Sequence, residues 1–344
     1  MKGTDGHATV VSCAPLTLPH ARFTRHTMLR SPPRYTNPAL PPLDEADRKI
    51  IDCLMRDGRA SGRDLAQSTG ISEANVSRRL SRLLEERSVR ILGFVPPECL
   101  GMHVQFVTYL RVKGDVETVA NDLLRYPDFS FVQSAFGGWD LVHHGVVQNS
   151  SALVDLLDRS IISHPMVHAA ETCTVLEFAS QPAAPAGASL RPLDQTDRMI
   201  IRQIQADGRM SFTEIAASTG TSATSAADRF RRLVADGIVR IVAMPDPTRI
   251  GLHLSGLIQL VLDRPTRQMV EQLRAVPELS FITVMSGSYP IGCEFQVRDG
   301  QHFDALRARL LTMPGVRDLR ALVHRRLYRQ TFEWGTAEPY AAAR

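Results

Sequence analysis

The chain has 344 residues, which is too long for one typical hydrophobic core and predicts two to four domains. A composition of 44% hydrophobic and 22% charged residues is typical of a soluble globular protein, and no apolar run is long enough to cross a membrane. Five cysteines without a C-x-x-C pair argue against a structural zinc site and a disulfide framework, and fit a reducing cytoplasm. The formal net charge is only +4, so bulk charge does not identify a nucleic-acid partner and local clustering must do so.

Residues 1–42 are rich in proline, threonine, arginine and alanine and show no apolar periodicity, so we expect a disordered tail. From Leu43 the chain repeats itself: residues 43–101 align without gaps on residues 193–251, and 23 of these 59 positions are identical. This agreement indicates an internal duplication at an offset of 150 residues. Residues 180–192, rich in alanine, proline, glycine and serine, are interpreted as a linker between the copies, and residues 331–344 as a C-terminal tail.

Each copy begins with three short predicted helices. In the first copy, Asp44, Ser61 and Ser72 are suitable N-caps for helices over residues 44–55, 61–69 and 72–86. Gly70 supplies the turn between the second and third helix, an order typical of a helix-turn-helix. The β-prone "VRILGF" that follows is interpreted as a wing strand, so we place winged helix-turn-helix domains at residues 43–95 and 193–245.

The second part of each copy alternates between strands and helices. The order is β-α-β-β-α-β, which is that of a ferredoxin-like domain, and we place these domains at residues 102–179 and 252–330. In the first copy we expect the elements at residues 104–112, 116–125, 130–135, 141–147, 151–163 and 167–178. In the second copy we expect them at residues 253–261, 266–275, 280–285, 291–297, 301–312 and 316–328. The fold class is therefore predicted as α+β, with two tandem copies of this two-domain unit.

The third helix of the first copy has two contrasting faces when it is turned by about 100° per residue. Its apolar face carries Val76, Leu80, Leu83 and Leu84. Its polar face, here called the arginine stripe, carries Asn75, Arg78, Arg79 and Arg82, with Ser72 at its N-terminal edge. Such a stripe suits a DNA major groove, because arginine bonds guanine, asparagine reads adenine and arginine also binds phosphate. The alternative is a solvated face paired with Glu85 and Glu86 at helical spacing.

The corresponding helix of the second copy predicts weaker DNA binding. Its candidate DNA-contacting residues are Ser222, Ser225, Arg229 and Arg232. The counterpart of Arg78 is Asp228, which phosphate repels, although a carboxylate can accept from cytosine. We therefore expect the first copy to provide most of the DNA affinity.

The order of these motifs resembles one protein family in particular. The stretch "LDEADRKIIDCLMRDGRASGRDLAQSTGISEANVSRRLSRLLEE" followed by "VRILGF" resembles the winged helix-turn-helix of the Lrp/AsnC, or feast/famine, transcription regulators. The β-α-β-β-α-β part with "FGGWDLV" resembles their effector-binding domain, and the resemblance covers about residues 43–328 in two copies. It implies a DNA-binding regulator that responds to a small molecule, often an amino acid. It also implies that the effector domains pair, with the ligand between them near the turn that joins the second and third strands.

On this resemblance, the first copy carries a candidate effector turn at Gly137, Gly138, Trp139 and Asp140. An acidic side chain at Asp140 suits an amino-acid ammonium group, and the backbone N–H groups of the glycine pair suit its carboxylate. Gly-Gly-Trp-Asp is also a plausible hairpin turn in any protein. The expected partners are double-stranded DNA, an amino-acid-like effector and further copies of the chain in a homo-oligomer, in the cytoplasm and associated with the nucleoid. No metal and no cofactor is expected.

The sequence departs from this family in three places. Two copies are fused where the family has one, and "EERSV" at Glu85 lacks the glycine that "ADGIV" keeps at Gly237. The second copy reads "GSYPI" at the position of the effector turn, with Pro290 in place of the aspartate. The second copy therefore lacks the acidic residue that an equivalent effector turn would carry.

Two other functions were weighed against a regulator. Siroheme decarboxylases resemble the same family, but the His-Asn-Tyr and Asn-x-Trp-Phe patterns expected of them are absent from "FSFVQSAFGGWDLVHHGVV". His143 and His144 are adjacent on a predicted strand, so they point to opposite faces and cannot form one two-histidine site. No nucleophile elbow, Walker loop or dinucleotide fingerprint occurs, so an enzyme is not expected. The third possibility is a metabolite-sensing module without DNA binding, to which loss of Arg78 and Arg82 would matter little.

Overall fold

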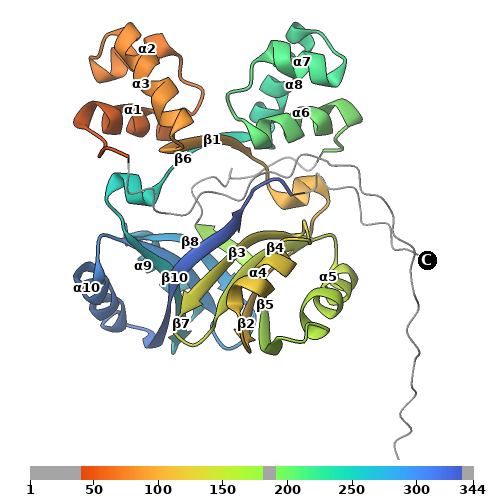
Figure 1. Ribbon diagram of the computed structural model, residues 1–344, viewed down its shortest axis with the longest axis vertical. Coiled ribbons are helices and arrows are strands. Elements are labelled where there is room, and N and C mark those ends of the chain that lie inside the picture. Colours follow the sequence, from red (N-terminus) through yellow and green to blue (C-terminus); the bar gives the residue numbers. More distant parts are fainter. Residues whose placement is uncertain (1–39, 181–190, 335–344) are drawn as a thin grey trace, which may run out of the picture. The chain divides into compact units, whose positions relative to one another are not determined.

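A computed structural model describes residues 40–180 and 191–334 of the chain (Figure 1). Almost all of the predicted N-terminal tail and linker, and the last ten residues of the predicted C-terminal tail, lie outside these described residues. The two copies are clear within them: each begins with three helices, here called a head, and continues into a ferredoxin-like part.

The heads form where the capping residues predict. The helices of the first head are α1 (Glu45–Arg56), α2 (Gly62–Thr69) and α3 (Glu73–Glu85), and those of the second are α6 (Gln195–Ala206), α7 (Phe212–Thr219) and α8 (Ala223–Ala235). Asp44 and Ser61 cap α1 and α2 with reciprocal capping boxes, and Gly70 adopts the left-handed conformation at the end of α2. Ser72 occupies the N-cap position of α3, but its side chain makes no capping hydrogen bond.

The strand predicted after each head forms and pairs with its counterpart in the other copy. Strand β1 (Val89–Phe94) runs antiparallel to β6 (Arg240–Pro245) and forms a two-stranded ribbon. A Cβ atom at Gly93 would lie 2.4 Å from the side chain of Ile204, so α6 of the second head packs directly on β1. The strand predicted at "VRILGF" is therefore present, and five of its six residues are buried.

The ferredoxin-like parts join into one closed eight-stranded barrel. The strands of the first copy are β2 (Val104–Val112), β3 (Phe129–Phe136), β4 (Leu141–Val147) and β5 (Val167–Ser180). Those of the second copy are β7 (Leu254–Leu262), β8 (Leu279–Met285), β9 (Ile291–Val297) and β10 (Val316–Gln330). The barrel order is β10-β3-β4-β2-β5-β8-β9-β7, so β5–β8 and β10–β3 are the two seams between the copies.

Helices cover the outer face of each half-barrel. They are α4 (Val116–Leu123) and α5 (Ser150–Leu157) in the first copy, and α9 (Thr266–Arg274) and α10 (Gly300–Leu311) in the second. Short helical turns complete the elements: a π turn at Asp158–Ile162 and the 3₁₀ turns η1 (Pro97–Leu100) and η3 (Pro247–Ile250). Each half-barrel therefore has its own hydrophobic core between sheet and helices, and the predicted β-α-β-β-α-β order is confirmed.

The two half-barrels fill the same place in their cores in opposite ways. In the first copy Phe106 of β2 pairs with Gly145 of β4, and in the second Gly256 of β7 pairs with Phe295 of β9. A Cβ atom at Gly145 would lie 2.3 Å from the Phe106 ring, and one at Gly256 would lie 2.5 Å from the Phe295 ring. Each half-barrel therefore packs one phenylalanine ring against one glycine. The ring is on the first strand of the first copy, β2, and on the third strand of the second copy, β9.

The first residues of the predicted C-terminal tail are packed, which corrects that prediction. Phe332 is buried, and its backbone carbonyl accepts a hydrogen bond from Gln205 of α6 at 2.8 Å. The indole N–H of Trp334 donates to the carbonyl of Val95 at 2.7 Å. Aromatic side chains at these positions gain from burial, which the boundary drawn after the last predicted strand did not take into account.

Candidate functional site

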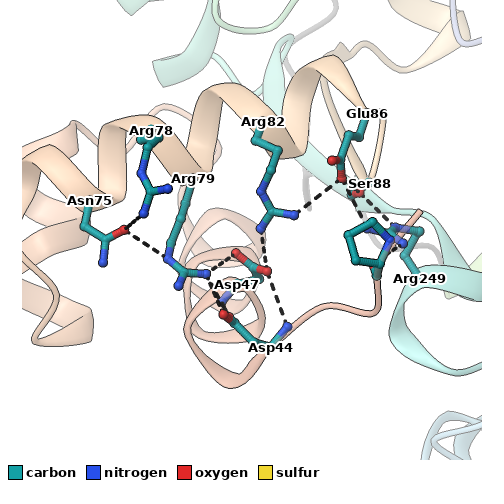
Figure 2. A network of polar contacts seen from close by, with 10 residues as sticks. Asp44, Asp47, Asn75, Arg78, Arg79, Arg82, Glu86, Ser88 and Arg249 are labelled. Carbon is teal, nitrogen blue, oxygen red and sulfur yellow. Dashed lines mark hydrogen bonds and ion pairs between the residues drawn. The ribbon is translucent and has the colours of Figure 1, made fainter. Parts of the chain in front are cut away.

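Two arginines of the stripe on α3 bind carboxylates of the same head. Arg79 Nη1 lies 2.8 Å from Asp44 Oδ2 and 2.8 Å from Asp47 Oδ1, and Arg82 Nη2 lies 2.6 Å from Asp47 Oδ2 (Figure 2). Asp47 is only 1% exposed, so its charge depends on these two guanidinium groups. The pKa of Asp44 is held below its usual value, first by the hydrogen bond from the Asp47 backbone N–H and then by Arg79. Arg79 and Arg82 thus fasten α3 to the first turn of α1.

The same network reaches the second copy. Arg82 Nη1 lies 3.6 Å from Glu86 Oε2, and that oxygen also accepts from Arg249 Nη2 at 3.2 Å (Figure 2). Arg249 belongs to η3 and donates to the hydroxyl of Ser88 at 3.0 Å as well. Of the two glutamates considered as alternative partners of the stripe, Glu86 is therefore engaged.

Arg78 differs from the other arginines of the stripe because it is exposed and its guanidinium meets no carboxylate among the described residues. Its Nη2 donates to Asn75 Oδ1 at 2.9 Å, and Arg79 Nε donates to the same oxygen at 3.2 Å. Ser77 and Ser81 are also exposed on this helix, and the sequence analysis did not place them in the stripe because they lie outside its row of arginines. The solvent-facing surface of α3 therefore contains Arg78 and several hydroxyl groups, including that of Ser72.

The second head keeps the buried carboxylate but changes its partners. Asp197, the counterpart of Asp47, is 4% exposed and binds Arg229 at 2.9 Å. Its second partner is Arg191 at 2.9 Å, which precedes the head, so Arg232 is not used as Arg82 is. Arg232 is exposed and has no hydrogen bond or ion pair with any described residue.

The remaining predicted residues of the second head sit at the start and middle of α8. Ser222 caps α8 by accepting from the backbone N–H of Ser225 at 3.1 Å. Asp228 is exposed and pairs with Arg231 at 2.6 Å. The face of α8 that corresponds to Arg78 therefore carries a neutralised carboxylate.

Two reciprocal arginines link the heads. Arg59 donates to the backbone carbonyls of Gly208 and Met210, each at 2.9 Å. Arg209, its counterpart, donates to the carbonyl of Gly58 at 2.8 Å. Burial lowers the pKa of both guanidinium groups from the usual arginine value. The "DGR" tripeptide present in both copies is the sequence signal for these arginines, but an arginine in a loop does not reveal its partner.

The candidate effector turn is tied to its surroundings by Asp140. The Asp140 Oδ2 atom accepts from the backbone N–H of Val112 at 2.8 Å, which fastens the turn to the end of β2. A Cβ atom at Gly137 would lie 2.2 Å from the carbonyl oxygen of Ala321, so the turn packs closely on β10 of the other copy. Gly138 faces open space, and the Trp139 ring lies 6.0 Å from the Tyr109 ring. The turn has the contacts of a structural hairpin, and its effector role stays a prediction.

The two adjacent histidines face opposite sides of the sheet, as the sequence predicts. His143 is buried on the helix side, with its ring centroid 4.3 Å from that of Phe129. His144 faces the barrel interior, with its ring centroid 5.7 Å from that of Phe131. Burial lowers their pKa values to about 3 and about 4, so both rings are neutral near pH 7. Within residues 40–180 and 191–334, no group of three histidine, cysteine or acidic side chains is placed to hold a metal ion.

The comparison with known proteins agrees with this architecture. A family model described as winged helix-turn-helix DNA-binding matches residues 43–87 and 193–240. The HTH-type transcriptional regulator FL11 of Pyrococcus horikoshii is 34% identical over 138 residues, which are 40% of this chain and 91% of that protein. The leucine-responsive regulatory protein of Salmonella typhimurium is 30% identical over 139 residues, 39% of this chain and 85% of that protein. The chain belongs to the Lrp/AsnC family of transcription regulators.

These Lrp/AsnC relatives have about the length of one copy, so the tandem fusion is a departure from them. The crystal structure of the siroheme decarboxylase NirDL superposes with a TM-score of 0.62 at 16% identity. It covers 83% of this chain and 93% of its own, so the likeness includes both copies of this Lrp/AsnC chain. At this identity the likeness shows the fold alone. Among the helices that the structure describes, none is both long and apolar enough to span a membrane.

Proposed function

We propose that this Lrp/AsnC-family chain is a cytoplasmic transcription regulator that binds double-stranded DNA sequence-specifically through its two heads and responds to a small-molecule effector. The observation that carries the proposal is the exposed face of α3, where Arg78 is free of carboxylates while the rest of the head is fixed by capping boxes and the Asp47 network. A rigid helix with an exposed guanidinium and hydroxyl groups suits a major groove. The named relatives are transcription regulators, and we assign no catalytic residue.

The residues of the stripe divide into two roles in this proposal. Ser72, Asn75 and Arg78 contact DNA, whereas Arg79 and Arg82 position α3 by binding the carboxylates of α1. In the second head the DNA contacts come from Ser222, Ser225 and the exposed Arg232, whose counterpart in the first head is Arg82, and Arg229 has the positioning role. The contribution of the second head is smaller because Asp228 replaces the exposed arginine.

One chain supplies two heads, because both the ribbon and the barrel are closed within it. We infer that it corresponds to a dimer of single-copy relatives and that further copies associate into a homo-oligomer with four or more heads. Sedimentation equilibrium at micromolar concentration measures this directly. A strict monomer with and without DNA would rule out the larger assembly.

The test of DNA binding uses fluorescence anisotropy with a labelled duplex of the upstream intergenic DNA. Arg78→Ala should weaken binding by about 1–3 kcal/mol if Arg78 reads a base, or lower the salt dependence by about one phosphate contact if it binds the backbone. Asp228→Arg, which gives the second head the side chain of the first, should strengthen binding. Arg267→Ala, which removes the same charge from an exposed position of α9, is the control. Equal affinities for Arg78→Ala and Arg267→Ala would contradict the proposed interface.

A further inference from the structure

A small, partly open cavity of about 60 Å³ lies in the barrel between the two copies. Its wall is mainly apolar and rich in aromatic rings, which come from both copies and from the packed residues that follow β10. These rings include Phe131, Phe178, Phe281, Phe332 and Trp334. No lysine or arginine lines the cavity among the described residues.

A single carboxylate, that of Glu294, lines this cavity. Its neighbours on β9, Cys293 and Phe295, are fully buried on the helix side, so the alternation of the strand directs Glu294 inward. The carboxylate has no hydrogen bond or ion pair with any described residue. Burial alone raises its pKa to about 7. An acidic group in such a place lacks the positive partner that would stabilise its charged form.

The position equivalent to Glu294 in the first copy is His144, at the offset of 150 residues, and it lines the same cavity. Its Nε2 atom is buried without a hydrogen-bond partner among the described residues. Burial lowers the pKa of His144 to about 4, so the ring contributes a neutral donor or acceptor. Among the described residues, the cavity wall thus offers an acid, a neutral imidazole, a few uncharged polar groups and aromatic faces, but no lysine or arginine.

We propose that this cavity binds a short organic amine, whose ammonium group pairs with Glu294 while its apolar body lies against the aromatic rings. A protonated amine supplies the missing positive partner, and aromatic faces attract cations. The small size of the cavity favours an amine of two or three carbons. An amino acid fits less well, because its carboxylate would find no cationic side chain in the wall. Use of this cavity as the effector site rests on the proposed regulatory function, but binding itself does not.

The experiment compares ligands that differ by one group. Ethylamine, propylamine, alanine and propionate are titrated into the full chain by calorimetry up to about 10 mM, since ligands with few heavy atoms bind weakly. The amines should bind, and alanine and propionate should bind at least tenfold more weakly or not at all. No binding of either amine, or alanine binding as tightly as ethylamine, would overturn the proposal.

The matched variants are Glu294→Gln, which keeps the shape of the side chain, and Glu177→Gln, which makes the same change at an exposed position of β5. Glu294→Gln should weaken amine binding at least tenfold, and Glu177→Gln should leave it unchanged. Equal binding by Glu294→Gln and the parent would remove the carboxylate from the site. Because the chain has two tryptophans, a Trp139→Phe background leaves Trp334 at the cavity wall as a fluorescent reporter of binding there.

The closing measurement separates this site from DNA binding. Anisotropy with the labelled duplex is repeated with and without propylamine for the parent and for Glu294→Gln. A change in DNA affinity in the parent alone would make the cavity the effector site. Amine binding without any change in DNA affinity would show that the cavity binds amines but does not regulate DNA binding. A DNA response without amine binding at Trp334 would overturn the site while leaving the regulator in place.

Discussion

The two heads are alike in how they hold a buried aspartate and differ in the residue that their third helix exposes. Both bury an aspartate of their first helix, Asp47 or Asp197, and both satisfy it with two guanidinium groups. On the outer face, however, the first head presents Arg78 and the second presents Asp228. A buried charge leaves little freedom to change, because losing its partner is costly, whereas an exposed position costs little to replace. The difference therefore indicates which residues build the head and which face outward for function.

The largest expected effect concerns the exchanged ring and glycine of the half-barrels. Phe106→Gly should destabilise the chain by about 3–5 kcal/mol, because it leaves a cavity where the ring packed. Adding Gly145→Phe, which gives the first copy the arrangement of the second, should restore much of that loss. The measurement is urea unfolding of the parent, both single variants and the double variant. Purely additive single effects would show that the two positions do not form one packing unit.

The next prediction distinguishes the arginines of the stripe that stabilise the head from the one that contacts DNA. The double variant Arg79→Ala with Arg82→Ala should lower the free energy of unfolding by about 3 kcal/mol, because it leaves Asp47 buried without a cation. Arg229→Ala with Arg191→Ala should do the same in the second head. Arg78→Ala is the control and should change stability by less than about 0.5 kcal/mol. If the first double variant unfolds like the parent yet loses DNA affinity, both arginines contact DNA instead.

The smallest expected effect is a difference between the half-barrels in how their stability depends on pH. The pKa of His143 is lowered to about 3 by burial, so the unfolded chain binds its proton first as the pH falls below about 6.5. The free energy of unfolding does not depend on this ring well above pH 6.5. Between pH 6.5 and 5.5 it should fall by about 1 kcal/mol, because only the unfolded chain protonates the ring. His143→Cys copies the counterpart Cys293 and should remove that part of the pH dependence. Thermal unfolding at the two pH values measures it, and an unchanged dependence in the variant would contradict a buried neutral ring.

Local signals in the sequence predicted the elements well. Asp44, Ser61 and Gly70 mark helix ends through chemistry that acts within a few residues, and the alternating pattern located β2, β4 and β9 at the observed bounds. The opposite faces of His143 and His144 followed from strand geometry alone.

Long-range contacts were not predictable in the same way. The partner of "VRILGF" lies in the other copy, and the partners of Arg79 lie 35 and 32 residues before it, at the N-cap and in the first turn of α1. Helical periodicity placed Arg79 on a polar stripe but did not reveal that α1 presents two carboxylates to it. The repeat offset shows that His144 and Glu294 occupy equivalent positions in the two copies. That they line one cavity depends on closure of the barrel, which the sequence does not show.

The reciprocal bonds of Arg59 and Arg209 have a consequence for the DNA that such a chain selects. A regulator built from two identical chains favours palindromic operators, because its symmetry makes both half-sites alike. Here the two reading faces are encoded separately, and Arg59 and Arg209 join the loops of their heads. The protein then fixes the spacing of the two half-sites, but their sequences need not be inverted repeats of each other. An operator with two unlike halves at a constant separation is the expected outcome.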